Sequence, residues 1–158
     1  MQDFRSVVTA LWARLGIGEP RFNEPGRVQL RIDGISLDLT DSGRGLLVVE
    51  GGAGVFAGDP VARARQTRRV LETNLGFVPS GDAGTYLKTR PNGEKSLTGR
   101  AVYDYRRTNL DYLVKIIEDV LRVAEYYGSE FKSVTSVVTQ RSAQALPDPL
   151  GAEVIFRP

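Results

Sequence analysis

Two side chains that carry much of protein chemistry are missing from this chain: its 158 residues contain no cysteine and no histidine. Without cysteine there are no disulfides, no thiolate nucleophile and no cysteine-ligated zinc. Without histidine the commonest general base and metal ligand is absent too. Asp, Glu, Lys or Tyr could still carry a reaction, but the composition disfavours an enzyme. No catalytic residue, cofactor or metal site is predicted.

Long apolar runs are also missing. No stretch approaches the roughly 20 residues that a membrane-spanning helix needs. The N-terminal segment has an acid at Asp3 and no apolar core followed by a cleavage site, so it does not read as a secretory signal. Cytoplasmic residence is therefore expected. Hydrophobic residues make up 41% and charged residues 25% of the chain, which is typical of a soluble globular domain. The net charge of +2 is weak evidence for a nucleic-acid partner.

The first patterned segment, Phe4–Leu15, is predicted to be an amphipathic helix. Its apolar residues follow the i, i+3, i+4, i+7 spacing of a single helix face, and Gly16 supplies a stop signal. They are Phe4, Val7, Val8, Leu11, Trp12 and Leu15. So broad an apolar face implies that this helix packs onto something else in the fold.

The segment "RVQLRIDGISLDL" predicts a β-hairpin. Asp33-Gly34 suits a two-residue type I′ turn, in which both positions need positive φ. That turn sets the register by placing Ile32 opposite Ile35, Leu30 opposite Leu37 and Val28 opposite Leu39. Since side chains alternate along a strand, all six apolar residues lie on one face. Residues 46–49 then predict a third strand, antiparallel to the second because the connection is short.

The glycines after this strand have two interpretations. Gly52, Gly54 and Gly58 fit a GxGxxxG spacing, a variant of the dinucleotide-binding fingerprint. That fingerprint needs a parallel strand leading directly into a helix, whereas this strand is third in a meander. Asp59-Pro60 is also typical of a helix cap and first position, which places the helix after the glycines. A glycine-rich connection to the next helix is the favoured interpretation.

The next helix is predicted from about Pro60 to Leu75. It carries a basic cluster, which is either a solvated face or a patch that binds anions; the solvated face is favoured, with Arg68 and Glu72 placed for an i,i+4 contact. The cluster consists of Arg63, Arg65, Arg68 and Arg69.

The segment from Gly84 to Tyr105 predicts a second hairpin. Pro91 and Gly93 suit a three-residue loop, which would place Leu87 opposite Leu97 and Arg90 opposite Glu94. A longer loop in another register is the alternative.

The longest helix is predicted from about Asn109 to Tyr127, with two adjacent apolar stripes that indicate contacts on two sides. From Lys132 the pattern weakens, and residues 132–158 are interpreted as a tail with short strands at Val134–Thr139 and Ala152–Phe156. The order of elements is then α-β-β-β-α-β-β-α. It predicts an α+β sandwich of an antiparallel twisted sheet and three helices, with one domain over residues 1–131.

This order of elements resembles class I type III secretion chaperones, the CesT/SycE-like family. "LWARLGI" is similar to the end of that family's first helix, "VQLRIDGISLDL" to its first hairpin, and "VLETNLGF", with Asn74, to the end of its central helix. The helix from Leu110 to Tyr127 is similar to its last helix. The resemblance covers about residues 4–130. Two features depart from the family: this chain is slightly basic, and its tail is longer.

The resemblance implies a homodimer in the bacterial cytosol that binds the N-terminal segment of a secreted effector and keeps it unfolded. It implies no catalysis and no cofactor, and it leaves open a contact with the secretion-system ATPase. The expected effector-binding residues are Val8, Leu11, Trp12, Leu15, Leu30, Leu37 and Leu46. The expected dimer interface contains Val70, Leu71, Leu75, Tyr86, Leu87 and Lys88. Two other functions remain open: a basic nucleic-acid-binding or regulatory module using Arg63–Arg69, and a nucleotide-dependent enzyme using the glycine-rich segment.

Overall fold

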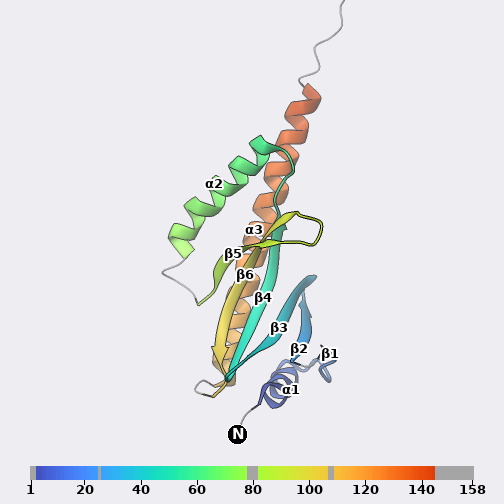
Figure 1. Ribbon diagram of the computed structural model, residues 1–158, viewed down its shortest axis with the longest axis vertical. Coiled ribbons are helices and arrows are strands. Elements are labelled where there is room, and N and C mark those ends of the chain that lie inside the picture. Colours follow the sequence, from blue (N-terminus) through green and yellow to red (C-terminus); the bar gives the residue numbers. More distant parts are fainter. Residues whose placement is uncertain (1–2, 25, 78–81, 107–108, 145–158) are drawn as a thin grey trace, which may run out of the picture.

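The computed structural model describes residues 3–24, 26–77, 82–106 and 109–144. In these residues three helices accompany one antiparallel sheet of six strands (Figure 1). The helices are α1 (Phe4–Leu15), α2 (Pro60–Phe77) and α3 (Leu110–Gln144). The strands are β1 (Phe22–Glu24), β2 (Arg27–Ile32), β3 (Ile35–Gly43), β4 (Leu46–Val55), β5 (Gly84–Thr89) and β6 (Lys95–Asp104). The predicted α+β order is confirmed, with β1 as an additional short strand.

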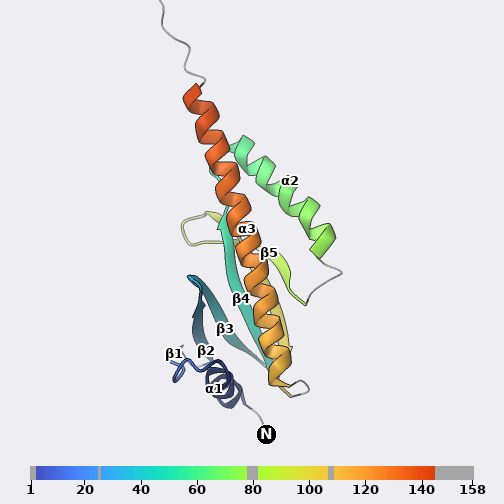
Figure 2. The ribbon, with the colours of Figure 1, turned by 180° about the vertical axis from the view of Figure 1, so that it is seen from behind.

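The sheet has the spatial order β1-β2-β3-β4-β6-β5, so β1 and β5 are its edge strands. Helix α3 runs along the sheet and continues past it, and α2 lies beside the upper part of α3 (Figures 1 and 2). Side chains of α1, α3 and one face of the sheet form a common core. On the opposite face of the sheet, polar residues of β2 and β3 such as Arg27, Gln29 and Ser36 are exposed.

Helix α1 has the predicted bounds because both of its ends are capped. Asp3 accepts a hydrogen bond from the Ser6 amide at 2.7 Å, and the Ser6 hydroxyl accepts one from the Asp3 amide at 3.1 Å. This reciprocal pair satisfies two donors at the helix start. These hydrogen bonds, the backbone one first, hold the pKa of Asp3 below its ordinary value. Gly16 ends the helix in the left-handed conformation, with φ of 67°.

Both predicted hairpins are confirmed in register. Ile32 pairs with Ile35 and Leu30 with Leu37, and the turn residues Asp33 and Gly34 have φ of 49° and 83°. In the second hairpin Leu87 pairs with Leu97. The Arg90 amide donates to the Glu94 carbonyl at 2.8 Å, as the three-residue loop requires. Local turn chemistry therefore sets the register in both cases.

The glycines after the third strand do not form a connection, which corrects the favoured interpretation. Gly51 and Gly52 pair with Gly99 and Thr98 of β6, so β4 continues through the glycines to Val55. Both neighbours of β4 are antiparallel. A dinucleotide site at the end of a parallel strand is therefore not formed here. Gly58 alone of the three fingerprint glycines lies between β4 and α2, where Asp59 caps α2 by accepting from the Ala62 amide at 2.7 Å.

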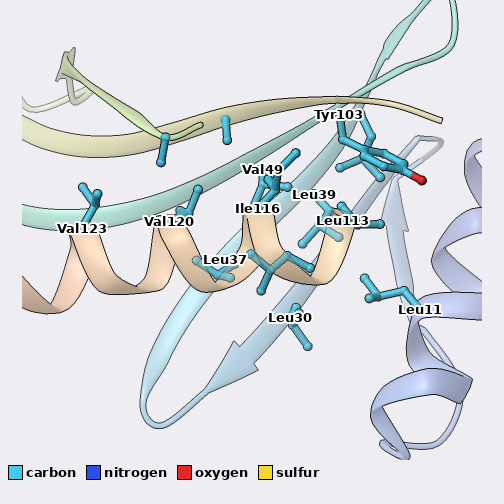
Figure 3. Close-up of a cluster of buried hydrophobic side chains, with 14 of the residues drawn as sticks. Leu11, Leu30, Leu37, Leu39, Val49, Tyr103, Leu113, Ile116, Val120 and Val123 are labelled. Carbon is cyan, nitrogen blue, oxygen red and sulfur yellow. The ribbon is translucent and has the colours of Figure 1, made fainter. Parts of the chain in front are cut away.

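The glycines of the central strands allow α3 to approach the sheet closely. A Cβ on Gly51 would lie 2.7 Å from Leu37 and 3.1 Å from Val120, and one on Gly99 would lie 3.1 Å from Val123. On Gly54 it would lie 2.5 Å from the Phe131 ring. A side chain at any of these positions would push the helix away. Figure 3 shows Val120 and Val123 of α3 pointing at the sheet beside Leu37 and Val49.

The predicted tail does not begin with a strand. Residues Val134–Thr139 belong to α3, which continues to Gln144, so the strand prediction there is wrong. The second predicted strand, Ala152–Phe156, lies outside the described residues. The helix prediction stopped too early, at Tyr127, whereas α3 continues through Gly128 to Gln144, a stretch in which no proline interrupts the helix. The division into a domain at 1–131 and a tail at 132–158 stays a prediction.

Candidate docking surfaces

Most of the residues predicted to contact an effector belong to the core. Five of the seven are buried, and Leu11 and Leu37 have no exposed surface at all. Figure 3 shows Leu11 pointing toward the space between α3 and the β2–β3 hairpin. A side chain that is closed off from solvent cannot bind another chain while the fold stays as it is. Five of the predicted residues are therefore core positions in the described structure, and their role in effector binding stays a prediction: Val8, Leu11, Trp12, Leu30 and Leu37.

Leu46 lies on the other face of the sheet from Leu30 and Leu37. The register of β3 and β4 pairs Leu39 with Val49 and Leu37 with Gly51, which puts the odd-numbered residues of β4 on the core face. Leu46 is even-numbered, so its half-buried side chain lies on the open face. The predicted groove is thus divided between two faces of the sheet. The sequence did not reveal this because the end of β3 contains a register shift between Asp41 and Gly43.

Apolar side chains remain accessible on the segment that joins α1 to β1. Leu15 and Phe22 are half-buried, and Ile17 is 48% exposed. The Phe22 ring packs edge-on against Phe4 with 6.1 Å between ring centroids, and the Arg5 guanidinium lies 4.8 Å from the centre of the Phe22 ring. We call Leu15, Ile17 and Phe22 the α1–β1 rim. It borders β1, whose outer side has no neighbouring strand in the described part of the chain.

A second apolar surface lies between α2 and the other edge strand, β5. It is a groove of about 920 Å³ whose lining includes Phe56, Leu71, Leu87 and Leu97. Leu71 is 62% exposed and Leu87 is 57% exposed. We call this surface the α2–β5 groove. Its lining contains four of the six residues predicted for a dimer interface, Val70, Leu71, Tyr86 and Leu87, although the Tyr86 hydroxyl donates a hydrogen bond to Glu50 on the open face.

The other two predicted interface residues lie differently. Lys88 is on β5 but on the open face of the sheet, where its ammonium lies 3.4 Å from Glu50. Leu75 belongs to α2, but its side chain lies outside the described part of the structure. Val70 is buried on the inner side of α2 and lines only the base of the groove.

Asn74 holds α2 in place beside the groove. Its side-chain oxygen accepts hydrogen bonds from the Tyr127 hydroxyl of α3 and the Thr85 hydroxyl of β5, each at 3.0 Å. One residue thereby links three elements. From the sequence, Asn74 was only part of a segment that resembles the end of the family's central helix. Its partners lie 11 and 53 positions away, so local pattern could not identify them.

The open face of the sheet is dominated by charge. Glu50 accepts a hydrogen bond from the Tyr86 hydroxyl at 2.8 Å and lies 3.8 Å from Arg100. Burial, followed by this hydrogen bond and the negative charge of Glu50, raises the pKa of Tyr86 to about 12. Tyr86 therefore stays protonated as a donor at neutral pH. This network crosses β4, β6 and β5 and stiffens the face without forming an apolar site.

The basic cluster on α2 is partly neutralised by neighbouring acids. Arg68 pairs with Glu72 at 2.9 Å, as the i,i+4 spacing predicted, and Arg69 pairs with Glu130 of α3 at 2.7 Å. The hydrogen bond to Glu130 raises the pKa of Arg69 further. Arg63 and Arg65 are exposed. Two of the four arginines of the cluster therefore already pair with acids of the same chain, which weakens the case for a nucleic-acid-binding surface.

The described residues lack the features of two other classes of function. They contain no group of three or more His, Cys, Asp or Glu side chains that could hold a metal ion. None of the helices in the described ranges is long and apolar enough to cross a membrane.

Comparisons with solved structures identify the fold. The chain is similar to the HopA1–SchA chaperone–effector complex, with 15% identity, a TM-score of 0.62, and coverage of 80% of this chain and 93% of the other. It is also similar to the Yersinia pestis type III secretion chaperone SycH in complex with a fragment of YscM2. There the identity is 19%, the TM-score 0.58, and the coverage 79% of this chain and 99% of the other.

A protein of another origin has the same fold. An uncharacterized protein from Methanothermobacter thermautotrophicus matches with 12% identity, a TM-score of 0.57, and coverage of 83% of this chain and 98% of the other. No protein-family model matches the chain, and no curated protein sequence matches it. This chain has the fold of class I type III secretion chaperones. At these identities the likeness shows the fold alone, and function has to be argued from surfaces.

Proposed function

We propose that this protein is a type III secretion chaperone. It binds the N-terminal region of a secreted effector in the bacterial cytosol and keeps that region unfolded and competent for secretion. The observation that carries the proposal is the shared fold, matched over 80% of this chain, with a complex of a chaperone and its effector. The lack of histidine and cysteine supports a role in binding rather than catalysis.

The α1–β1 rim is the client surface in this proposal. An extended client segment can add to the outer side of β1 through backbone hydrogen bonds, while its apolar side chains cover Ile17 and the half-buried Leu15 and Phe22. A folded client has few apolar side chains free for such a contact. Binding would therefore favour the unfolded form of the client by mass action.

The test begins with finding the client. A tagged copy of the chain would be purified from its native bacterium, and secreted proteins that co-purify would be identified by mass spectrometry. The N-terminal region of each candidate would then be titrated against the purified chain. We expect that region to bind tightly and to stay unfolded while it is bound. A chain that binds no secreted protein would overturn the proposal.

A pair of substitutions tests the location of the client surface. Ile17→Asp should weaken client binding at least tenfold and leave the melting temperature nearly unchanged, because Ile17 is half exposed and outside the core. Val102→Asp on the open face is the matched control, since Val102 is also 48% exposed. If only Val102→Asp lost client binding, the client-binding surface would instead be the open face of the sheet.

The proposal includes a homodimer formed through the α2–β5 groove. Leu71 and Leu87 are the most exposed large apolar side chains of this groove. A two-fold contact would place the same patch of both copies face to face and bury the leucines. Sedimentation at micromolar concentration should give about twice the chain mass. Leu71→Asp should give a folded monomer, whereas Ile17→Asp should stay dimeric, and a wild-type monomer at high concentration would contradict this interface.

A contact with the secretion-system ATPase belongs to the same proposal. A chaperone that carries an unfolded client must release it at the secretion machinery. The complex of chain and client should therefore bind the purified ATPase more tightly than the free chain does. Surface plasmon resonance of the ATPase with the free chain and with the complex of chain and client would measure this difference in affinity.

A further inference from the structure

Besides its two edge strands, β1 and β5, the sheet has a free edge in its interior, at the upper end of β4. Strand β3 pairs with β4 only as far as Gly51, where it reaches Leu37, because the β2–β3 hairpin turns at Asp33 and Gly34. Strand β4 continues to Val55 and is paired there only on its other side, with β6. Residues 52–55 therefore present backbone groups toward the hairpin side with no neighbouring strand among the described residues. Such an edge is a template for another strand.

A groove of about 830 Å³ runs along this edge. Its floor is β4 from Gly52 to Val55, one wall is α3 from Ala124 to Lys132, and the other wall is the tip of the β2–β3 hairpin. Small residues on the floor and on α3 leave room for another chain, and the half-buried Ile35 supplies accessible apolar surface. Figures 1 and 2 show β4 continuing beyond the hairpin tip while α3 runs alongside it. The groove thus combines an apolar lining with unpaired backbone.

We propose that residues Ala152–Phe156 of the same chain bind this groove as an added strand on β4. The segment reads "AEVIF" and is predicted to be extended, with Val, Ile and Phe favoured in strands. Side chains of Ala152, Val154 and Phe156 alternate with those of Glu153 and Ile155. The first set would face α3 and cover Ile35, and the second set would face solvent. This inference concerns a different surface from the α1–β1 rim and does not depend on the proposed function.

The geometry of α3 puts the segment within reach. From Lys132, at the edge of the groove, α3 continues to Gln144 and rises about 18 Å over those residues. Residues 145–151 connect Gln144 to the segment and can span about 23 Å when extended. The chain can therefore fold back along α3 and reach the level of Lys132.

Charge does not select the occupant of the groove. Lys132 and Glu125 of α3 line the groove, whereas Glu153 and Arg157 share the solvent-facing side of the segment with Ile155. What favours this occupant is its covalent tether through residues 145–151, which gives it a high effective concentration at the groove. The closed edge would also be protected from pairing with strands of other molecules.

The absence of native cysteine makes a crosslinking test clean. In the full chain, Ser129→Cys on α3 would be combined with Ala152→Cys and treated with a short bismaleimide. Ser129 lines the groove and is exposed, so its substitution leaves the core intact. A crosslink within one chain is the expected product. The control pair combines Ala152→Cys with Thr9→Cys on the exposed side of α1, and it should react far less.

Hydrogen exchange gives a second, independent measurement. In full-length protein, Val154→Asp should speed exchange of the amides of residues 52–55 roughly tenfold, because burying one valine side chain changes a docking equilibrium by at least that factor. Ile155→Asp, which would face solvent, is the matched control and should leave exchange unchanged. Crosslinks between two chains would reassign the groove to a second copy. Equal reaction of both cysteine pairs, or equal exchange in both variants, would overturn the proposal.

Discussion

Helices α3 and α2 both lie beside the sheet, but they approach it in different ways. Helix α3 lies against β4 and β6, where Gly51, Gly54 and Gly99 remove the side chains that would hold it away. Helix α2 is tied to β5 and α3 through Asn74, and the α2–β5 groove stays open beside it. The same chain thus builds one interface that is closed within the protomer and one that stays available.

The largest effect is expected at the closed interface. Leu11→Asp would put a charge at a position with no exposed surface, next to side chains of the sheet and α3. Burying an unpaired carboxylate costs several kcal/mol, which is comparable to the whole stability of a small domain. We expect this variant to be unfolded by circular dichroism. Leu15→Asp, at the half-buried end of the same helix, is the control and should stay folded.

The glycine contacts can be tested by adding one methyl group. Gly54→Ala would place a Cβ 2.5 Å from the Phe131 ring in a backbone conformation, φ of 149°, that side chains disfavour. We expect a loss of about 1–3 kcal/mol in the free energy of unfolding, measured by urea denaturation. Gly52→Ala is the matched control because nothing lies within 4 Å of its added Cβ. Similar losses in both variants would contradict the close approach of α3.

The charged face offers a test in alkaline solution. Burial raises the pKa of the Tyr86 hydroxyl to about 12 from an ordinary value of 10.0. Between those pH values the unfolded chain loses this proton before the folded chain does, so the free energy of unfolding falls as the pH rises. Tyr86→Phe removes this contribution. The variant should lose less stability than wild type between about pH 10 and 12 in thermal melts. Equal losses of stability in wild type and Tyr86→Phe would show that Tyr86 has the same pKa in the folded and unfolded chain.

The smallest effect is expected on the outer side of α2. The side chain of Arg68 is 82% exposed, and its ion pair with Glu72 is screened by water. Arg68→Ala should therefore change the free energy of unfolding by no more than about 0.5 kcal/mol. Urea denaturation at low and high salt would measure the change. A larger loss would mean that the position of α2 beside the sheet depends on this surface ion pair.

Local patterns in the sequence were sufficient for several elements. The Asp3–Ser6 cap and Gly16 bound α1, and the Asp-Gly turn determines the pairing of Leu30 with Leu37. These features depend on residues a few positions apart, so their physics is contained in the local sequence. The same holds for the second hairpin and for Asp59 at the start of α2. Together they define the α+β fold class.

The candidate surfaces depend on contacts that the sequence does not contain. Leu11, Leu15 and Ile17 are all apolar, yet only the packing of α1 against α3 and the sheet determines that the first is closed off and the last half exposed. A glycine in the sequence is equally compatible with a phosphate loop, a turn or a close helix contact. What decided among these was the position of α3, whose Val120, Val123 and Phe131 meet the glycines from far along the chain. A residue is buried only when a second segment packs on it. The sequence of one segment therefore determines its secondary structure, while the segment that packs on it determines which of its residues remain available for binding.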